Sequence, residues 1–196
     1  MVKKVTNSQI IAQYLDNYGK KYYLRELASL LKKPHQTIKP YLEELTKEKI
    51  LIKNKRKNIT EYELNLKNKK IYDYITIAEK EKLIEKLKED TLLNILYEKL
   101  SVYFNKNIFI IFGSAVIKIQ KESDIDLLVI GKKDMSEPIK DFEEIYNKKI
   151  HKTQIVDLNK LNSTLIKEVY KKHLILNNTE QIICFFGELY EQNKLV

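Results

Sequence analysis

The chain is poor in the residues that most often define a structural class by themselves. Its 196 residues include one cysteine, three histidines and no tryptophan, and all but two of its basic residues are lysines. One cysteine excludes a disulfide within the chain. Because Cys184 lies in the apolar run 182–186, we expect it to be a small buried side chain rather than a ligand or nucleophile. His35 has no second His or Cys at a useful spacing, which argues against a zinc site there.

Long apolar segments are also missing from the sequence. No run approaches the length of a membrane span, and the first ten residues, MVKKVTNSQI, lack the apolar part of a signal peptide. We therefore expect a cytoplasmic protein without a membrane partner. A hydrophobic content of 43% and a charged content of 32% are typical of a soluble globular chain. A chain of 196 residues is long enough for one large domain or two small ones.

The net charge of +9 is distributed unevenly along the chain. Residues 1–70 contain 17 basic and 7 acidic side chains, a balance of +10, whereas residues 71–196 contain 19 and 20, a balance of −1. This asymmetry predicts two domains with different partners. A basic segment of this kind is typical of nucleic-acid binding, although a solvated lysine surface has the same charge count.

One stretch in the second half combines features that indicate phosphate and metal chemistry. An apolar run ends at Gly113-Ser114, and after a polar loop Ser123-Asp124-Ile125-Asp126 leads into a second apolar run. Side chains alternate along a strand, so Asp124 and Asp126 are expected on one face. Paired carboxylates are commonly compensated by a divalent cation, and oxygen ligands favour Mg²⁺ or Mn²⁺. Gly113 lets the backbone approach a ligand, and Ser114 offers a hydroxyl and an N–H to a phosphate.

These residues resemble the signature of the DNA polymerase beta-like nucleotidyltransferases, Gly-Ser followed by Asp-x-Asp at the start of a strand. The Ser-Asp-Ile-Asp-Leu form is similar to the minimal nucleotidyltransferases of archaea and bacteria. The family has a third carboxylate on a later strand, and the matching residue here is Asp157, in the expected strand 153–158. The resemblance implies that Asp124, Asp126 and Asp157 hold two Mg²⁺ (or Mn²⁺) ions. It also implies that Gly113 and Ser114 hold the phosphates of a nucleoside triphosphate, with ATP the expected donor.

The segment after Ser114 departs from the family pattern. A basic residue and a second glycine are expected there, but the chain reads Ala115-Val116-Ile117-Lys118, and the loop is about one residue short. Lys118 or Lys121 could supply the missing cation. The departure leaves open a protein that binds a nucleotide or a partner through this domain without catalysis.

The first half is expected to form three short helices, over about 7–19, 23–32 and 37–48, because apolar residues recur at helical spacing in each. Two strands, 50–53 and 59–64, then flank a basic turn at residues 54–58. This is the element order of a winged helix-turn-helix, which the first half also resembles.

In the winged-helix fold the third helix enters the major groove and the hairpin approaches the phosphate backbone. The residues expected to contact DNA are therefore the polar ones of this helix and the cations of the turn: Gln36, Thr37, Lys39, Tyr41, Lys55, Arg56 and Lys57. Pro40 lies inside the helix and is best tolerated in a first turn, so the helix could start as late as Thr37. The alternative for this domain is a protein–protein or dimerisation module.

Together these observations predict an α+β protein with an N-terminal winged helix-turn-helix (1–68) and a small mixed-sheet nucleotidyltransferase domain flanked by helices (69–196). The predicted function is transfer of a nucleoside monophosphate to an unidentified hydroxyl acceptor. The resemblance extends to antitoxins that modify a toxin, which implies a toxin-like partner protein, and a homodimer also stays open. The alternative function is a non-catalytic DNA-binding regulator whose transferase-like domain senses nucleotide or binds a partner.

Overall fold

The computed structural model describes residues 5–56, 59–119 and 123–195. The chain divides into two compact units, Met1–Glu79 and Lys80–Val196. Both units combine helices with a β-sheet, so the predicted α+β class is confirmed. The predicted domain boundary at 68/69 falls just before helix α4 (Lys70–Glu89), inside which the two units join, and it stays a prediction.

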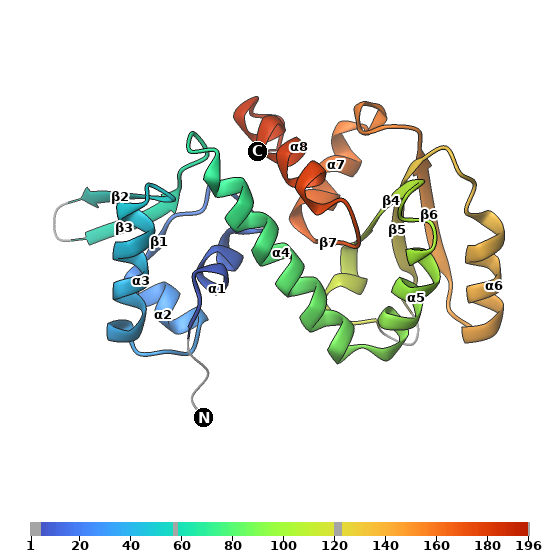
Figure 1. Cartoon of the computed structure of the whole chain (residues 1–196), viewed down its shortest axis with the longest axis horizontal. Coiled ribbons are helices and arrows are strands. Elements are labelled where there is room, and N and C mark those ends of the chain that lie inside the picture. Colours follow the sequence, from blue (N-terminus) through green and yellow to red (C-terminus); the bar gives the residue numbers. More distant parts are fainter. Residues whose placement is uncertain (1–4, 57–58, 120–122, 196) are drawn as a thin grey trace. The chain divides into compact units, whose positions relative to one another are not determined.

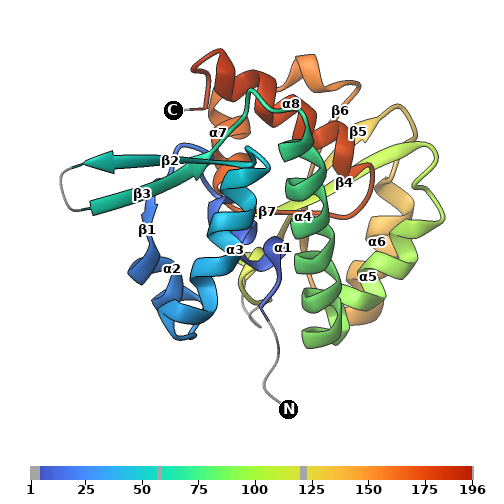
Figure 2. The same cartoon turned by 60° about the vertical axis from the view of Figure 1, so that its left-hand side comes forward.

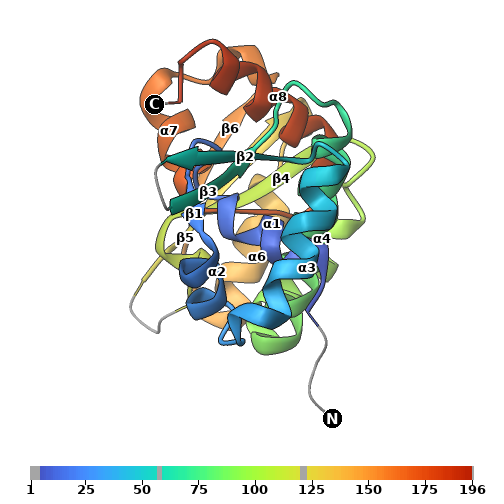
Figure 3. The same cartoon turned by 90° about the vertical axis from the view of Figure 1, so that its left-hand side faces the viewer.

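The described residues of the first unit form short helices, the start of α4 and a three-stranded antiparallel sheet of order β1-β3-β2 (Figure 3). Its elements are α1 (Asn7–Ile11), the 3₁₀ turn η1 (Ala12–Tyr14), β1 (Tyr22–Tyr23), α2 (Leu24–Leu30), α3 (His35–Lys47), β2 (Leu51–Arg56) and β3 (Ile59–Leu64). The first helix begins where the sequence predicts, because Thr6 and Gln9 form a capping box. The buried Tyr14 hydroxyl donates to the Tyr62 carbonyl oxygen at 3.0 Å, which ties the helices to the sheet.

Helix α3 begins two residues earlier than Thr37, at His35, with Pro34 as its N-cap residue. Pro40 therefore lies in the second turn, where its missing N–H leaves the Gln36 carbonyl without the usual helical donor. Gln36 and Pro40 are both exposed, so water can reach that carbonyl. The inner face of the helix is secured by Ile38, Leu42 and Leu45, all 0% exposed.

The hairpin of the first unit is longer than the sequence predicts. Strand β2 continues to Arg56, which pairs with Ile59, so the basic residues Lys55 and Arg56 belong to the strand and not to a five-residue turn. In Figures 1 and 2 the β2–β3 hairpin extends beyond the helices of its own unit.

The second unit is built on a four-stranded mixed sheet of order β6-β5-β4-β7, in which only the β5–β6 pair is parallel. Its strands are β4 (Asn107–Phe112), β5 (Ile125–Gly131), β6 (Ile150–Ile155) and β7 (His173–Ile175). The helices are the end of α4, α5 (Thr91–Ser101), α6 (Ser136–Tyr146), α7 (Ser163–Lys171) and α8 (Thr179–Glu191), with short 3₁₀ turns η2 (Gly113–Val116) and η3 (Leu158–Lys160).

Helices cover both faces of this sheet, α5 and α6 on one and α7 and α8 on the other (Figures 1 and 2). On the first face, Phe109, Ile111, Ile125, Leu127 and Val129 form a continuous core with the apolar sides of α5 and α6. Alternation then places Asp126 on the second face, where α7 packs against β4.

Two sequence expectations need correction at this level. The strand expected at 153–158 runs instead from Ile150 to Ile155, three residues earlier. Cys184, expected to be buried, is exposed on α8. The apolar segment 174–189 contains the end of strand β7 and most of helix α8. In the described part of the chain, no helix combines the length and apolar character that spanning a membrane requires.

Candidate functional site

The centre of the candidate site is the point where the Gly113 backbone meets the Asp126 carboxylate. These residues lie on neighbouring strand ends, because Phe112 pairs with Asp126. Gly113 has φ +74°, and a Cβ added there would stand 2.7 Å from Asp126 Oδ2. A side chain at this position would therefore be strained and would also collide with the carboxylate.

The turn after Gly113 is a short 3₁₀ helix that also presents Ser114. The Ser114 side chain is exposed, and its hydroxyl makes no hydrogen bond to any residue that the structure describes. Its carbonyl oxygen accepts from the backbone N–H groups of Ile117 and Lys118 at 3.1 and 3.4 Å. Ala115 and Val116 are buried in the core, whereas Ile117 and Lys118, which stand where the family pattern has a basic residue and a glycine, are exposed.

A third residue of the site, His151, lies beside Asp126. The parallel pairing of β5 and β6 sets His151 directly opposite Asp126. Its Nδ1 is 3.3 Å from Asp126 Oδ1, and the imidazole is 72% exposed. His151 lies outside the Gly-Ser and Asp-x-Asp motif, so the sequence predicts no role for it. A polar residue at the start of a strand parallel to β5 was the available signal.

Helix α7 completes a pocket of about 370 Å³ over this end of the sheet. Leu165 and Glu168, three residues apart on one side of α7, line it together with Lys171 at the end of the helix and Lys172 directly after it. The Gly113 N–H donates to the Lys172 carbonyl oxygen at 3.2 Å, so the end of α7 is fixed to the glycine turn. The remaining lining residues are Phe112, Gly113, Asp126, His151 and Thr153.

The two lysines of α7 are the cations of this pocket. Both are exposed, and neither pairs with a carboxylate in the ranges that the structure covers. Lys152, next to His151 in sequence, is held elsewhere, because its ammonium lies 2.8 Å from Ser136 Oγ and 3.3 Å from Asp134 Oδ1. Hydrogen bonds from Ser136, together with Lys152, lower the pKa of Asp134 to about 2. The predicted replacement cation Lys118 is exposed, and Lys121 lies outside the described residues.

The predicted third carboxylate does not join this site. Asp157 follows the last residue of β6 by two positions and caps η3, where its side chain accepts from the Asn159 N–H at 2.9 Å. Six residues separate it from His151 along an extended segment, on the order of 15–20 Å at 3.3 Å per residue. It lines a different pocket, with Asn107 and Ile130 at the opposite end of the sheet.

The expectation that Asp124, Asp126 and Asp157 converge is therefore wrong. Asp124 directly precedes β5 and is exposed, two residues from the half-buried Asp126. In the described ranges, no three His, Cys, Asp or Glu side chains form a group that could hold a metal ion.

The residues predicted to contact DNA are mostly at the surface of the first unit. Gln36, Thr37 and Lys39 are exposed on α3, and Tyr41 is half-buried. Lys55 is exposed on β2, the Arg56 backbone belongs to the same strand, and Lys57 lies outside the described residues. Acidic residues share the surface of α3, where Lys39 lies 3.8 Å from Glu43.

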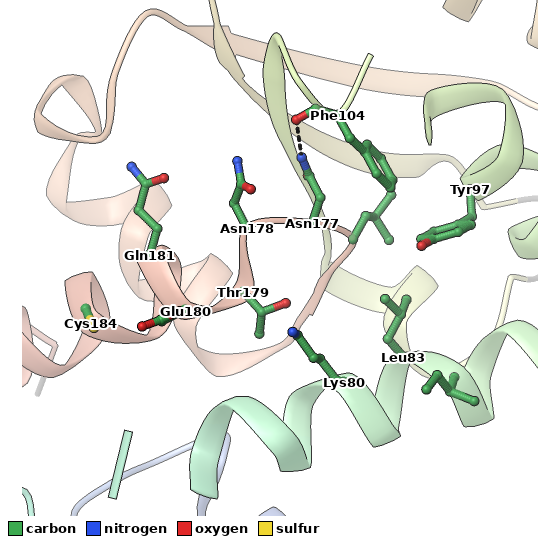
Figure 4. A pocket seen from close by; sticks show the side chains of 12 residues that line it. Lys80, Leu83, Tyr97, Phe104, Asn177, Asn178, Thr179, Glu180, Gln181 and Cys184 are labelled. Carbon is green, nitrogen blue, oxygen red and sulfur yellow. Dashed lines mark hydrogen bonds between the residues drawn. The ribbon is translucent and has the colours of Figure 1, made fainter. Parts of the chain in front are cut away.

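A roomier pocket, of about 830 Å³, lies elsewhere in the second unit (Figure 4). Lys80, Leu83, Tyr97 and the start of α8 line it, and the Asn177 side chain donates to the Phe104 carbonyl oxygen at 3.1 Å beside it. Among the residues described there, none belongs to the predicted site. Size alone therefore does not mark the candidate site, whose chemistry lies in the smaller pocket.

Comparison with known protein families assigns part of the chain to one of them. The family model "Polymerase beta, Nucleotidyltransferase" matches residues 81–181, just over half of the chain, and includes Gly113, Asp126 and His151. A search of curated proteins finds no match.

Similar solved structures include a toxin–antitoxin with AMP-PNP, at 15% identity, and a mutant of the toxin–antitoxin MntA-HpeT, at 14%. Each match covers 51% of this chain and 86% of the other, with a TM-score of 0.38. Likeness at this level carries no argument about activity or partner. The family match, in contrast, spans the whole segment from the end of α4 to the start of α8. The chain belongs to the polymerase beta nucleotidyltransferase family.

Proposed function

We propose that the second unit transfers a nucleoside monophosphate from a nucleoside triphosphate to a hydroxyl acceptor. The observation that carries this proposal is the close approach of the Gly113 backbone to the Asp126 carboxylate, at a pocket whose two lysines pair with no carboxylate of the described residues. The acceptor oxygen would attack the α-phosphorus, a P–O bond would form there, and pyrophosphate would leave. The family to which the chain belongs supports this reaction class.

In this proposal the triphosphate lies along the Gly113-Ser114 turn. Ser114 offers its exposed hydroxyl, and Gly113 leaves room for a phosphate oxygen because it has no side chain. Lys171 and Lys172 take the role of the basic residue that the turn itself lacks. Their ammonium groups would neutralise part of the triphosphate charge from the end of α7, so that no cation is needed on the turn itself.

The carboxylates fit a divalent cation that arrives with the nucleotide. Mg²⁺ is commonly bound by one or two carboxylates, with substrate phosphates and water completing its shell. Asp124 and Asp126, two residues apart at the start of β5, match that donor set, whereas Asp157 does not contribute. A bound cation would stabilise charge on the triphosphate and on the leaving pyrophosphate. Of the two ions that the resemblance implies, only one therefore has carboxylate ligands at this site.

Nucleotide binding tests this proposal before any acceptor is known. The probe is α,β-methylene-ATP with Mg²⁺, whose bridge cannot be cleaved, titrated by calorimetry against the full chain. We expect saturable binding at one site, and Asp126→Asn to weaken it by about tenfold or more because a carboxylate ligand is lost. Asp157→Asn, the matched control, should bind as the wild type does. Equal loss in both variants, or no binding at all, would contradict the proposed site.

We also propose that the first unit is a winged helix-turn-helix that binds DNA. Three helices followed by an antiparallel hairpin support the fold, and the exposed Gln36, Thr37, Lys39 and Lys55 support the contact surface. Tyr23 and Asn54 hydrogen-bond to Glu61 and Glu63, which keeps the acidic side chains of β3 engaged within the unit. The cations of the hairpin would then contact phosphates with little repulsion from these carboxylates.

The second candidate function is a non-catalytic regulator that binds DNA and senses nucleotide. The turn after Ser114 favours it, because Ile117 and Lys118 stand in place of the basic residue and second glycine of the family pattern. A toxin-like partner protein, an antitoxin role, and ATP as the donor nucleotide rest on the family resemblance alone. A cytoplasmic location and a homodimer likewise remain proposals.

A further inference from the structure

The imidazole of His151 lies where a cation held by Asp126 would find its next ligand. In the absence of Asp157 from this end of the sheet, His151 is the residue of β6 that faces Asp126. Both side chains belong to the strand face that lines the α7 pocket. The position opposite the second aspartate therefore carries a nitrogen donor where the family pattern would place an oxygen.

The separation of the two donor atoms fits a shared metal ion better than a strong hydrogen bond. Nδ1 and Oδ1 are 3.3 Å apart, beyond the usual 2.7–3.2 Å of an N–H···O bond. A cation about 2.1–2.2 Å from each atom would make an angle of roughly 100° between them, within the range of tetrahedral and octahedral sites. An ion pair at a ring that is 72% exposed contributes little by itself.

We propose that His151 is a metal ligand, so that the site selects a first-row transition-metal ion such as Mn²⁺ over Mg²⁺. Imidazole nitrogen binds transition-metal ions better than it binds Mg²⁺, whose preferred ligands are carboxylates, carbonyls and water. The side chains supplied by the chain would be Asp126 and His151, with Asp124 two residues away. This inference rests on the proposed nucleotide–metal site and specifies which metal occupies it.

Direct metal binding to the full chain, with Mn²⁺ alone as the probe, tests the inference. We expect electron spin-echo spectra of bound Mn²⁺ to contain modulation from a directly coordinated nitrogen. His151→Ala should remove that modulation and weaken Mn²⁺ binding by about tenfold. His35→Ala, which changes another exposed histidine, is the matched control and should leave both unchanged.

A second variant separates ligation from a merely structural role. His151→Asp would restore an all-oxygen donor set, so the ratio of Mn²⁺ to Mg²⁺ affinity should fall by about tenfold while Mg²⁺ binding improves. Absence of nitrogen modulation in the wild type, or an unchanged affinity ratio in His151→Asp, would overturn the inference.

The two proposals fail in different ways. Nucleotidyl transfer that proceeds with Mg²⁺ and is unaffected by His151→Ala would leave the proposed function standing and overturn the histidine ligand. Nitrogen-coordinated Mn²⁺ in a chain that binds no nucleotide would support the histidine ligand and contradict the proposed function.

Discussion

At the scale of single residues, Gly113 determines how close a ligand can come to Asp126. Its backbone is left-handed, a conformation that other residues rarely adopt. In addition, the Cβ of any other residue would lie only 2.7 Å from Asp126 Oδ2. Gly131, at the other end of β5, is a useful comparison. It also has a positive φ, and a Cβ there would meet the Asn107 side chain and the Lys106 carbonyl oxygen.

Substitution of these two glycines separates strain from function. Gly113→Ala should lower the free energy of unfolding by about 1–2 kcal/mol through the left-handed conformation. It should also weaken nucleotide binding by tenfold or more, because Asp126 must move. Gly131→Ala should destabilise the chain to a similar or greater extent but leave nucleotide affinity unchanged. Denaturant unfolding and calorimetry measure the two effects, and equal loss of affinity in both variants would contradict this account.

Much of the residue-level site was predictable, and the exceptions have a physical reason. The ends of two neighbouring strands hold Gly113, Ser114, Asp124 and Asp126. Their proximity was predictable because an apolar strand, a turn and a second strand that begins with acidic residues follow one another in the sequence. Asp157 depends on where β6 pairs with β5, and apolar alternation in one strand does not fix its register with another. The strand begins three residues earlier than expected, and His151 is the residue of β6 that pairs with Asp126, whereas Asp157 lies beyond the end of the strand.

At the scale of elements, helix and strand types were predictable where local signals are strong. Thr6 with Gln9 caps α1 and Asp90 caps α5, and Thr and Asp are residue types that favour the start of a helix. The start of α3 was misplaced because Pro40 was taken as a first-turn residue, whereas three buried aliphatic side chains stabilise the helix around it. The β2–β3 hairpin was underestimated because lysines are poor strand formers in isolation, yet they fit an exposed strand.

The hairpin gives the proposed DNA contact a measurable signature. If about four to six phosphates are neutralised, log K for duplex DNA should fall against log salt with a slope of roughly −4 to −5. Replacement of Lys55, Arg56 and Lys57 by Ala should flatten that slope by about 3 units. Fluorescence anisotropy at several salt concentrations measures it in the full chain.

The matched control replaces three exposed lysines of the second unit, Lys132, Lys149 and Lys160, by Ala. It removes the same charge and should leave the slope nearly unchanged. A similar loss in both triple variants would indicate diffuse attraction, and no DNA binding in the wild type would favour the protein–protein alternative for the first unit.

At the scale of the whole molecule, the two units divide the charge. Residues 1–79 contain 17 basic and 9 acidic side chains, whereas residues 80–196 contain 19 and 18, so balances of +8 and +1 make up the net +9. The excess positive charge lies in the unit proposed to bind DNA. The unit that belongs to the nucleotidyltransferase family is nearly neutral, and Lys171 and Lys172 lie at its pocket.

The fate of labelled ATP tests the central claim most directly. The full chain is incubated with Mg²⁺ or Mn²⁺ and candidate hydroxyl acceptors, including the chain itself, DNA and RNA ends, and cell extract. If the second unit transfers a nucleoside monophosphate, label from the α-phosphate should appear on an acceptor, label from the γ-phosphate should leave as pyrophosphate, and Asp126→Asn should abolish the transfer. Transfer of the γ-label, or α-label transfer that survives Asp126→Asn, would contradict the account.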